Sequence, residues 1–374
     1  MGVSAQGSAS WKRIAAAGSI AALVVVAGLL VRISGASAAI TITVLNTNDS
    51  GPGSLRLAVA NAESGDTIKV PAGKYVLTSG ELLVNTRVRI EGVGARKTII
   101  DGNGASRIFE IPHGGSGTVL SRLTAQHGNA GDDNGGGIAL TDADLRLQRV
   151  ALKKNRVNFN DNFSGGGIDA TGTTHVVIAR SVVSGNRGYN GGGMDDISEL
   201  RVVTSTIAGN SAGGPNSNGD GGAIEGAGSV TIVNSTIAGN RCFNGRGCGG
   251  GLFADATAKG SIIARNLAFD PNGKRPGSPG NPGTEDNCVD ALASQGHNLE
   301  GRKDCGLSKP SDLQRTNPLL KKLGDYGGQT NTRALRGGSP AVDAGARKCG
   351  KKDQRGVHRP QGRRCDIGAF ERAS

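Results

Sequence analysis

Residues 205–210 and residues 235–240 spell the same six letters, STIAGN, thirty positions apart. Related segments end at three other asparagines: VALKKN at Asn155, SVVSGN at Asn186 and SIIARN at Asn266. With the five asparagines aligned, apolar side chains recur three, eight and ten positions upstream, and serine recurs five positions upstream in four repeats. Steps of two are typical of β-strands, whose alternate side chains share a face, and the single step of three indicates a bend between two strands.

A glycine run followed by an apolar residue opens each repeat, from GGGI ending at Ile138 to GGGL ending at Leu252. This apolar residue precedes the asparagine by 14–18 residues, and one repeat spans 24–31 residues. A unit of three short strands cannot bury its apolar side alone, so the next unit must stack on it. The sequence therefore predicts an all-β fold, a right-handed parallel β-helix with coils over about residues 65–300.

The aligned asparagines would lie one rung apart in such a helix, where stacked amide side chains form a hydrogen-bonded ladder. The glycines allow the tight corners between sheets. Low-complexity disorder is the alternative interpretation. It explains the content of 63 glycines, but disordered chains lack periodic apolar columns.

The first 38 residues have the layout of a secretory signal peptide. Lys12 and Arg13 precede an apolar run over residues 14–31, and Ala36 and Ala38 supply the small side chains of a cleavage site. An uncleaved membrane anchor is the alternative, because the apolar run is long. Both interpretations predict export, to the medium or to the cell surface.

A short amphipathic helix is expected at residues 54–64. Ser54 can cap its N-terminus, Leu55 and Val59 share its apolar face, and Gly65 closes it. Such a helix would plug the open end of the β-helix core. The expected domains are a signal peptide or anchor at 1–38, a capped β-helix at 39–312 and a C-terminal module at 313–374.

Six cysteines fall into three neighbouring pairs, which suggests disulfides in an exported protein. None has the CxxC spacing of a zinc site. The first pair lies in one glycine-rich loop, the second flanks an irregular polar segment, and the third brackets a block of repelling cations. The expected bridges are Cys242–Cys248, Cys288–Cys305 and Cys349–Cys365.

Both ends of the β-helix resemble known sequence motifs. The stretch TITVLNTNDSGPGSLRLAVANAESGDTIKV resembles the CSLREA motif of exported bacterial β-helix proteins, without its Cys and Glu. The stretches NPLLKKLGDYGGQTNTRALRGGSPAVDAGA and CGKKDQRGVHRPQGRRCDIGAFE are similar to the choice-of-anchor Q domain that ends bacterial surface β-helix proteins. The resemblance implies export and a pectate-lyase-like β-helix. It implies no defined reaction, since these proteins share none.

Three acids, Asp169, Asp195 and Glu225, each follow an inward-pointing apolar residue and should point outward from successive coils about 4.8 Å apart. Such a strip has three interpretations. The acids could simply be solvated, they could bind calcium through their oxygens, or their mutually raised pKa values could serve general acid catalysis. Adjacent and alternate rungs approach the carboxylate separations of about 5 Å and about 6.5–9.5 Å found in glycosidases.

A specific enzyme motif does not support catalysis. Polygalacturonases carry Asn-Thr-Asp, Asp-Asp, His-Gly and Arg-Ile-Lys in that order. Here Asp195-Asp196 is present, but His127-Gly128 precedes it, and the first and last motifs are missing from the sequence.

The loops between each asparagine and the next glycine run vary in length and share one edge of the solenoid, where repeat proteins often bind ligands. Asn and Asp also serve ordinary turns, which is the competing interpretation. The polar residues of these loops are Asp132, Asp133, Asn134, Asn158, Asn160, Asp161, Asn216, Asn218 and Asp220.

A basic block near the C-terminus is the candidate surface for polyanions. Acidic polysaccharide or anionic cell-surface glycan fits an exported protein, whereas nucleic acid does not, since aromatics are only 3% of the chain. A plain solvated surface is the alternative. The block contains Arg347, Lys348, Lys351, Lys352, Arg355, Arg359, Arg363 and Arg364.

The sequence thus favours a secreted or surface-associated β-helix protein that binds ligands or serves as a structural element, without catalysis. The alternative is a polysaccharide lyase or glycoside hydrolase that acts on acidic polysaccharide through Asp169, Asp195 and Glu225. No cofactor is expected apart from calcium in the second interpretation of the strip. We expect a monomer that contacts membranes only through residues 1–38.

Overall fold

Each central coil consists of four strands in a fixed order. In the coil that contains Asp169, these are β13 (Ile168–Thr171), β14 (His175–Ala179), β15 (Val182–Ser184) and β16 (Arg187–Gly188). The first three match the predicted strands. The prediction of three strands per coil was incomplete, because the fourth strand has only two residues and its sequence varies from coil to coil.

The computed structural model describes residues 38–158, 163–214, 219–226, 228–244, 247–269 and 283–373. The predicted signal peptide therefore lies outside the described residues except for Ala38. The residues from Ala39 to Ser374 form one compact unit. Within the described ranges, no helix has the length and apolar character needed to cross a membrane.

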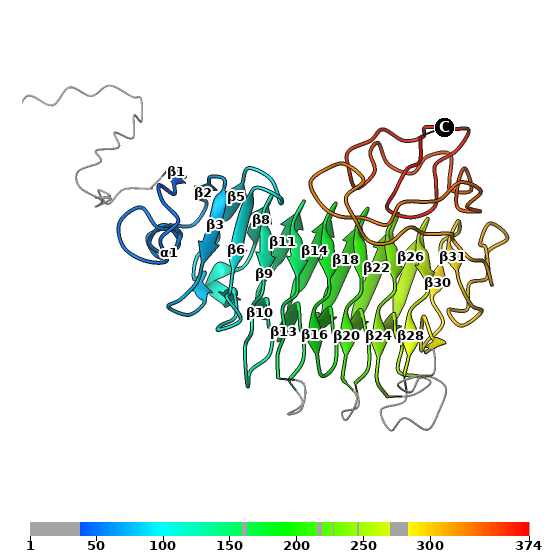
Figure 1. The fold of residues 1–374 in the computed structure, drawn as a ribbon, viewed down its shortest axis with the longest axis horizontal. Coiled ribbons are helices and arrows are strands. Elements are labelled where there is room, and N and C mark those ends of the chain that lie inside the picture. The colour runs from blue at the N-terminus through cyan, green and yellow to red at the C-terminus, as the bar shows by residue number, and fades with distance from the viewer. Residues whose placement is uncertain are drawn as a thin grey trace, which may run out of the picture. The chain divides into compact units, whose positions relative to one another are not determined.

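Equivalent strands of successive coils stack into four sheets, which run through the solenoid side by side (Figure 1). We number the sheets in the order in which one coil passes through them. Sheet 1 contains β4 (Leu82–Leu83), β7 (Phe109–Ile111), β10 (Ile138–Thr141), β13, β17 (Met194–Asp195), β21 (Ile224–Glu225) and β25 (Leu252–Phe253). Sheet 2 contains β1 (Thr41–Thr43), β2 (Thr67–Val70), β5 (Arg89–Gly92), β8 (Thr118–Ser121), β11 (Leu145–Gln148), β14, β18 (Glu199–Val203), β22 (Ser229–Val233), β26 (Ala256–Lys259) and β30 (Ala293–Ser294).

In each central coil, the strand of sheet 3 follows the bend after sheet 2, and the strand of sheet 4 follows the corner asparagine. Sheet 3 contains β3 (Gly73–Val76), β6 (Thr98–Asp101), β9 (Thr124–Gln126), β12 (Ala151–Lys153), β15, β19 (Thr206–Ala208), β23 (Thr236–Ala238), β27 (Ile262–Ala264) and β31 (Leu299–Glu300). Sheet 4 contains β16, β20 (Ser211–Ala212), β24 (Arg241–Cys242), β28 (Leu267–Ala268) and β29 (Thr284–Glu285). Described strand pairs are parallel except β28 with β29, so the predicted all-β parallel β-helix is confirmed.

The Gly-Asn pair of STIAGN makes the corner between sheets 3 and 4. Gly209 and Gly239 have φ values of 71° and 76°, a left-handed conformation that glycine adopts without strain. The asparagine that follows lies inside the corner, and its side chain receives hydrogen bonds from the coil before it. The predicted ladder is confirmed from Asn155 through Asn266, and it continues to Asn287, which donates to Asp304.

Small aliphatic side chains fill the core, as the low aromatic content predicts. Ile168, Ile178 and Val183 of one coil are fully buried, one from each of sheets 1, 2 and 3. Burying each such side chain contributes about 1.5–3 kcal/mol. Each coil contributes only a few buried side chains, and stacking of the coils joins them into one continuous core.

A short helix covers the N-terminal end of the core. Helix α1 spans Leu55–Ala60, and the Ser54 hydroxyl accepts a hydrogen bond from the Leu57 N–H at 3.2 Å. Leu55 and Val59 are buried, and α1 contacts β2 and β4. The helix ends sooner than the predicted residue 64, because Asn61 provides the C-cap ahead of the turn at Gly65.

The C-terminal module, residues 313–373, consists of loops with isolated bridges and covers the outer face of sheet 3 (Figure 1). Its Leu320, Ile367 and Phe370 pack with Ile262 and Ala264 of β27. The module therefore packs on coils near the C-terminal end of the solenoid. Leu323 extends the contact to Ala151 and Val182, which lie several coils closer to the N-terminal end.

The C-terminal motif residues hold this module together. The buried Asp353 accepts hydrogen bonds from the Val357 and Glu371 N–H groups at 2.9 and 3.1 Å. The buried Glu371 accepts from the Gln361 and Asp366 N–H groups. Loops without strands must pair their backbone donors with side chains, which explains why so many motif residues are acidic.

All three predicted disulfides are present: Cys242–Cys248, Cys288–Cys305 and Cys349–Cys365. The Cα atoms of the pairs lie 6.1, 5.0 and 6.3 Å apart, within the normal range for a bridge. The structure contains no free cysteine.

Candidate functional site

The three candidate acids lie in one column on sheet 1. Asp169 pairs in register with Ala139 on one side and with Asp195 on the other. Met194 pairs with Ile224, which places Glu225 on the rung after Asp195, and Glu225 in turn pairs with Phe253. The predicted carboxylate strip is therefore present and ends at Ala139 and Phe253.

Burial distinguishes this strip from a solvated surface. Asp169 is 4% exposed and Asp195 is 2% exposed, while Glu225 is partly exposed. The expectation of simply solvated side chains is wrong for the two aspartates. Each glycine run turns back over the acid that follows it: Gly165 and Gly191 adopt left-handed φ values of 66° and 50°, and a Cβ atom on either would collide with the Cβ atom of that acid.

Asp195 and Glu225 form a hydrogen-bonded pair of acids whose pKa values are both raised. Burial raises the pKa of Asp195 well above its usual range, and the hydrogen bond to Glu225 and the negative charges of Glu225 and Asp196 raise it further. Burial also raises the pKa of Glu225, although the hydrogen bond from Asp195 opposes this. Two carboxylates on adjacent rungs cannot both ionise without a neutralising partner.

One carboxyl oxygen of Asp169 has no hydrogen-bond partner. Its Oδ1 atom is buried and makes no hydrogen bond in the structure. Burial, followed by the charges of Asp195 and Asp196, raises the pKa of Asp169 to about 8. An unsatisfied buried carboxyl oxygen costs about 1–3 kcal/mol, so the arrangement invites a ligand.

Asp196 is a fourth acid at this site, and with Asp195 and Glu225 it forms a group of carboxylates that could hold a cation. One oxygen from each of Asp195, Asp196 and Glu225 lies within 4.8 Å of the others. A Cβ atom at Gly226 would lie 2.6 Å from Asp196 Oδ1 and 3.1 Å from Asp195 Oδ1, so only glycine leaves this space open. Carboxylate oxygens around a small open space suit a hard cation such as calcium. We call Asp169, Asp195, Asp196 and Glu225 the carboxylate cluster.

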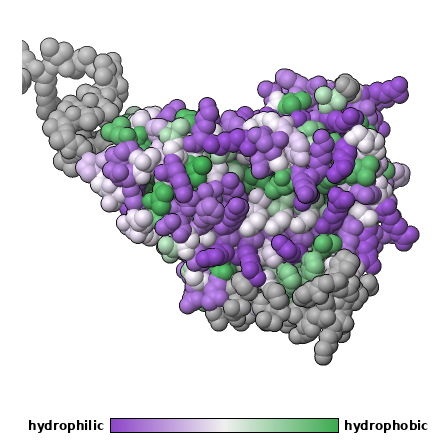
Figure 2. All heavy atoms as spheres, viewed as in Figure 1, coloured by the Kyte–Doolittle hydropathy of each residue, from purple (hydrophilic) through white to green (hydrophobic). Residues whose placement is uncertain are grey.

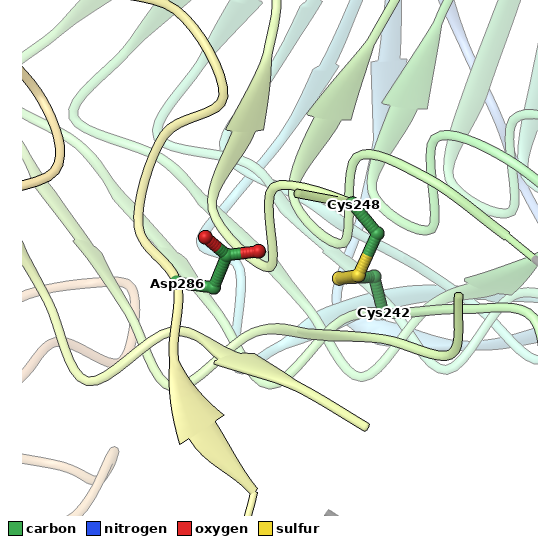
Figure 3. Close-up of side chains that lie close together, drawn as sticks. All are labelled: Cys242, Cys248 and Asp286. Carbon is green, nitrogen blue, oxygen red and sulfur yellow. A yellow bond between two sulfur atoms is a disulfide. The ribbon is translucent and has the colours of Figure 1, made fainter. Parts of the chain in front are cut away.

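Two other groups of potential metal ligands are explained by disulfides. Cys242, Cys248 and Asp286 lie together, but Figure 3 shows the two sulfur atoms joined to each other. Asp286 Oδ2 instead accepts the N–H groups of Gly247 and Gly249 and so anchors the disulfide loop. In the group of Glu300, Asp304 and Cys305, the cysteine is likewise oxidised.

The polar loops at this edge largely bond to one another. Asp133 pairs with the buried Arg107 at 2.6 Å, Asp132 accepts from Asn158 at 2.9 Å, and Asp220 accepts from Asn244 at 3.0 Å. Asn134 accepts from the Ser164 N–H at 2.8 Å. The other candidates in these loops, Asn160, Asp161, Asn216 and Asn218, lie outside the described residues.

The basic block divides into a surface part and a structural part. Arg347, Lys348, Lys351, Lys352 and Arg363 are exposed, and Arg364 is partly exposed. Lys348 also lines a pocket of about 280 Å³ together with Lys259 and His297. In the space-filling view, hydrophilic side chains dominate the visible face of the C-terminal module (Figure 2).

Two members of the block do not belong to a binding surface. Arg359 is buried and forms an ion pair with the buried Glu371 at 3.2 Å. Arg355 pairs with Asp353 at 2.8 Å and lies 3.6 Å from the centre of the Phe370 ring. Counting charges along the sequence could not distinguish these two arginines from the exposed cations. It does not show that Arg359 meets Glu371, which lies 12 residues later in the sequence, or that Arg355 pairs with Asp353.

A second polar site was missed by the sequence interpretation. Lys74, Asp101, His127, Lys154 and Arg156 line a pocket of about 300 Å³ at the corner between sheets 3 and 4. Part of the signal was present in the repeat alignment, because Lys154 occupies the corner position that is glycine in the STIAGN coils. His127 occupies the same corner one coil earlier, outside the five aligned repeats.

Comparison with known proteins assigns the chain to no family. No family model matches the chain, and no curated protein matches it. A crystal structure of the pectate lyase Pel9A is similar with a TM-score of 0.49 and 14% identity, over 90% of this chain and 98% of that chain. Similarity at this level concerns chain course alone, so activity has to be argued from the side chains described above.

Proposed function

We propose that the protein is an exported β-helix binding protein without catalytic activity, whose carboxylate cluster binds a calcium ion. The observation that carries the proposal is the convergence of one oxygen each from Asp195, Asp196 and Glu225, within 4.8 Å of one another, beside the buried Asp169, whose Oδ1 atom has no hydrogen-bond partner. A divalent cation would supply the positive charge that these neighbouring acids lack. Calcium accepts six to eight oxygen ligands, including backbone carbonyls and water, so an incomplete ring of side chains is sufficient.

Burial argues against catalysis by the same residues. A general acid must come within about 3 Å of the atom that it protonates. Asp195 is only 2% exposed, and its side chain is engaged in a hydrogen bond with Glu225. A polysaccharide chain would have to displace the glycine turns to reach it. The raised pKa of Asp195 would suit a lyase or glycoside hydrolase, but closely spaced carboxylates that bind a cation have raised pKa values for the same reason, since the cation would supply the neutralising charge.

An acidic glycan is the proposed macromolecular partner. Five cations of the basic block are exposed, namely Arg347, Lys348, Lys351, Lys352 and Arg363, and Lys348 lines a pocket together with Lys259 of the solenoid. Export agrees with three disulfides and with the resemblance of both chain ends to bacterial surface proteins. Within the CSLREA-like stretch, Arg56 has a structural role, since it donates to the Glu81 carbonyl and pairs with Asp49.

Calorimetric titration with calcium tests the cation site. The metal-free protein should bind one calcium ion per chain, and Asp169→Asn and Glu225→Gln should each weaken binding at least tenfold. Asp255→Asn, which changes an exposed acid elsewhere on the solenoid, is the matched control and should bind as the unaltered protein does. Equal affinity in all four proteins would refute the site.

A separate assay tests the absence of catalysis. The purified protein, with and without calcium, is incubated with acidic polysaccharides, and new reducing ends and unsaturated uronides are measured. We expect none above background. Sustained turnover that Asp195→Asn abolishes would show that the lyase or hydrolase alternative is correct.

A further inference from the structure

The pocket of about 300 Å³ at the corner between sheets 3 and 4 lies in the N-terminal coils, where β6, β9 and β12 end. It is lined by side chains of three successive coils: Asp101, His127 and Lys154, with Lys74 and Arg156 beside them. The residues belong to neither the carboxylate cluster nor the basic block. All of them lie within the described part of the chain.

Positive charge exceeds negative charge in this pocket. Lys74, Lys154 and Arg156 are exposed cations, whereas Asp101 is the one acid that lines the pocket. Asp101 is already engaged: its Oδ2 atom accepts from Gln126 Nε2 at 2.9 Å and pairs with Lys74 Nζ at 3.0 Å. Next to the pocket, burial and the charges of Lys154 and Arg96 lower the pKa of Lys153. The charges of Lys154 and Arg156 are thus left for a ligand.

His127 is held in a defined orientation. Its Nδ1 atom lies 3.1 Å from Asp101 Oδ2, whose carboxylate is 2% exposed. Burial by itself would raise the pKa of Asp101, but hydrogen bonds from Gln126, the Asn103 N–H, Lys74 and His127 lower it to about 2. A carboxylate beside Nδ1 fixes the proton on that nitrogen, so Nε2 is left to accept a hydrogen bond.

The backbone around the pocket is fixed by the solenoid. The Gly128 N–H donates to Asn155 Oδ1 at 2.8 Å, and the Gly104 N–H donates to the His127 carbonyl at 2.7 Å. Gly104 has a left-handed φ of 69° and lies beside the Arg156 guanidinium, since a Cβ atom built there would be in ordinary contact with Arg156 Nη2 at 3.9 Å. A site on a rigid scaffold binds with less ordering cost than one on a loop.

We propose that this pocket binds a small hydroxylated organic anion, with its carboxylate or phosphate group at Lys154 and Arg156 and a hydroxyl group donating to His127 Nε2. Arginine and lysine provide charge-assisted hydrogen bonds to either anionic group. The carboxylate–histidine pair provides the acceptor for the hydroxyl group. The pocket is at the lower end of the usual ligand-site volumes, which fits one sugar-sized unit.

The test uses the full chain and three probes: glucuronate, glucose 6-phosphate and glucose. Ligand-observed NMR and calorimetry should show millimolar or tighter binding of at least one anionic probe, and glucose should bind at least tenfold more weakly. Preference between the two anions identifies carboxylate or phosphate as the source of the charge. Glucose binding as tightly as both anions would overturn the proposal.

Three variants locate the binding to this pocket. Lys154→Gln and Arg156→Gln should each weaken the preferred anion about tenfold, which corresponds to one charge-assisted contact. Arg201→Gln, an exposed arginine on sheet 2, is the control and should leave affinity unchanged. Affinity that is the same in all of these proteins would overturn the proposal.

His127→Gly tests the hydroxyl contact without threatening the fold, since glycine occupies the same corner in later coils at Gly185, Gly209 and Gly239. The variant should keep the melting temperature and lose anion affinity by about fivefold to tenfold. A variant that melts normally and binds normally would contradict the assigned role of His127. Calcium binding at the carboxylate cluster should be unaffected in every variant, so the two proposals can fail separately.

Discussion

Asn210 Nδ2 donates a hydrogen bond to Asn240 Oδ1 at 2.9 Å, which joins the last letters of the two identical STIAGN segments. The same Asn240 oxygen accepts the Asn210 N–H at 3.0 Å, and Asn210 Nδ2 also donates to the Val183 carbonyl at 3.1 Å. The sequence repeats at this point because each coil needs the same amide at the same corner. Asn210 thus forms hydrogen bonds with both the preceding and the following coil.

We expect Asn210→Ala to destabilise the protein by about 3 kcal/mol or more, because it leaves the buried Asn186 N–H and Nδ2 without the acceptor that they share. Urea unfolding measures the change. Asn48→Ala, in an exposed loop, should stay within about 0.5 kcal/mol of the unaltered protein. Equal losses for the two variants would mean that the ladder does not stabilise the coils.

The repeat made this ladder and three of the four sheets predictable, since period-two columns and their bends are local in sequence. The burial of Asp169 and Asp195 was not predictable, because it depends on the path of the glycine turns that fold back over them. The pocket at His127 was missed for another reason. Asp101, whose carboxylate contacts His127 Nδ1, lies one coil away at a separation of 26 residues. Its coil is outside the five aligned repeats.

The basic block should contain cations of two kinds. Arg359→Gln should destabilise the C-terminal module by about 3–5 kcal/mol, because it leaves Glu371 buried without its ion-pair partner. Lys351→Gln, at an exposed position, should change the unfolding free energy by less than about 0.5 kcal/mol. Limited proteolysis of the module and thermal unfolding report both effects. A neutral result for Arg359→Gln would contradict the assigned structural role.

The exposed part of the block should govern binding to polyanions. Replacing Lys351 and Lys352 with Gln should lower the salt concentration that elutes the protein from a sulfated-polysaccharide column, since exposed charges act through a screened field. The charge-matched control replaces Arg146 and Arg201, which are exposed on sheet 2. Equal shifts in both double variants would indicate that net charge alone, and no defined surface, determines retention.

Without divalent cations, stability should fall as pH rises. The pKa of Asp169 is about 8 in the folded chain, against about 3.9 for an unfolded aspartate. The folded state holds the Asp169 proton more tightly than the unfolded state does. The contribution of this proton to the free energy of unfolding is therefore complete below pH about 4 and is lost as pH rises through about 8. Asp195 acts in the same direction, because its pKa is raised as well.

Melting temperatures in a chelator should therefore drop by several degrees from pH 5 to pH 9, and calcium should reverse the drop. Asp169→Asn should make the pH profile shallower, because the amide has no proton to lose and only the contribution of Asp195 remains. A profile that is the same in the variant and the unaltered protein would show that Asp169 does not cause the pH dependence.

Proton release on calcium binding tests the central claim most directly. Calorimetric titrations at pH 7 in buffers of different ionisation enthalpy give the number of protons displaced per calcium ion. If the ion replaces the protons held by Asp169 and by the pair of Asp195 and Glu225, on the order of one to two protons should leave per ion, and Asp169→Asn should release about one fewer. Calcium that binds without releasing protons, or that does not bind, would contradict the account.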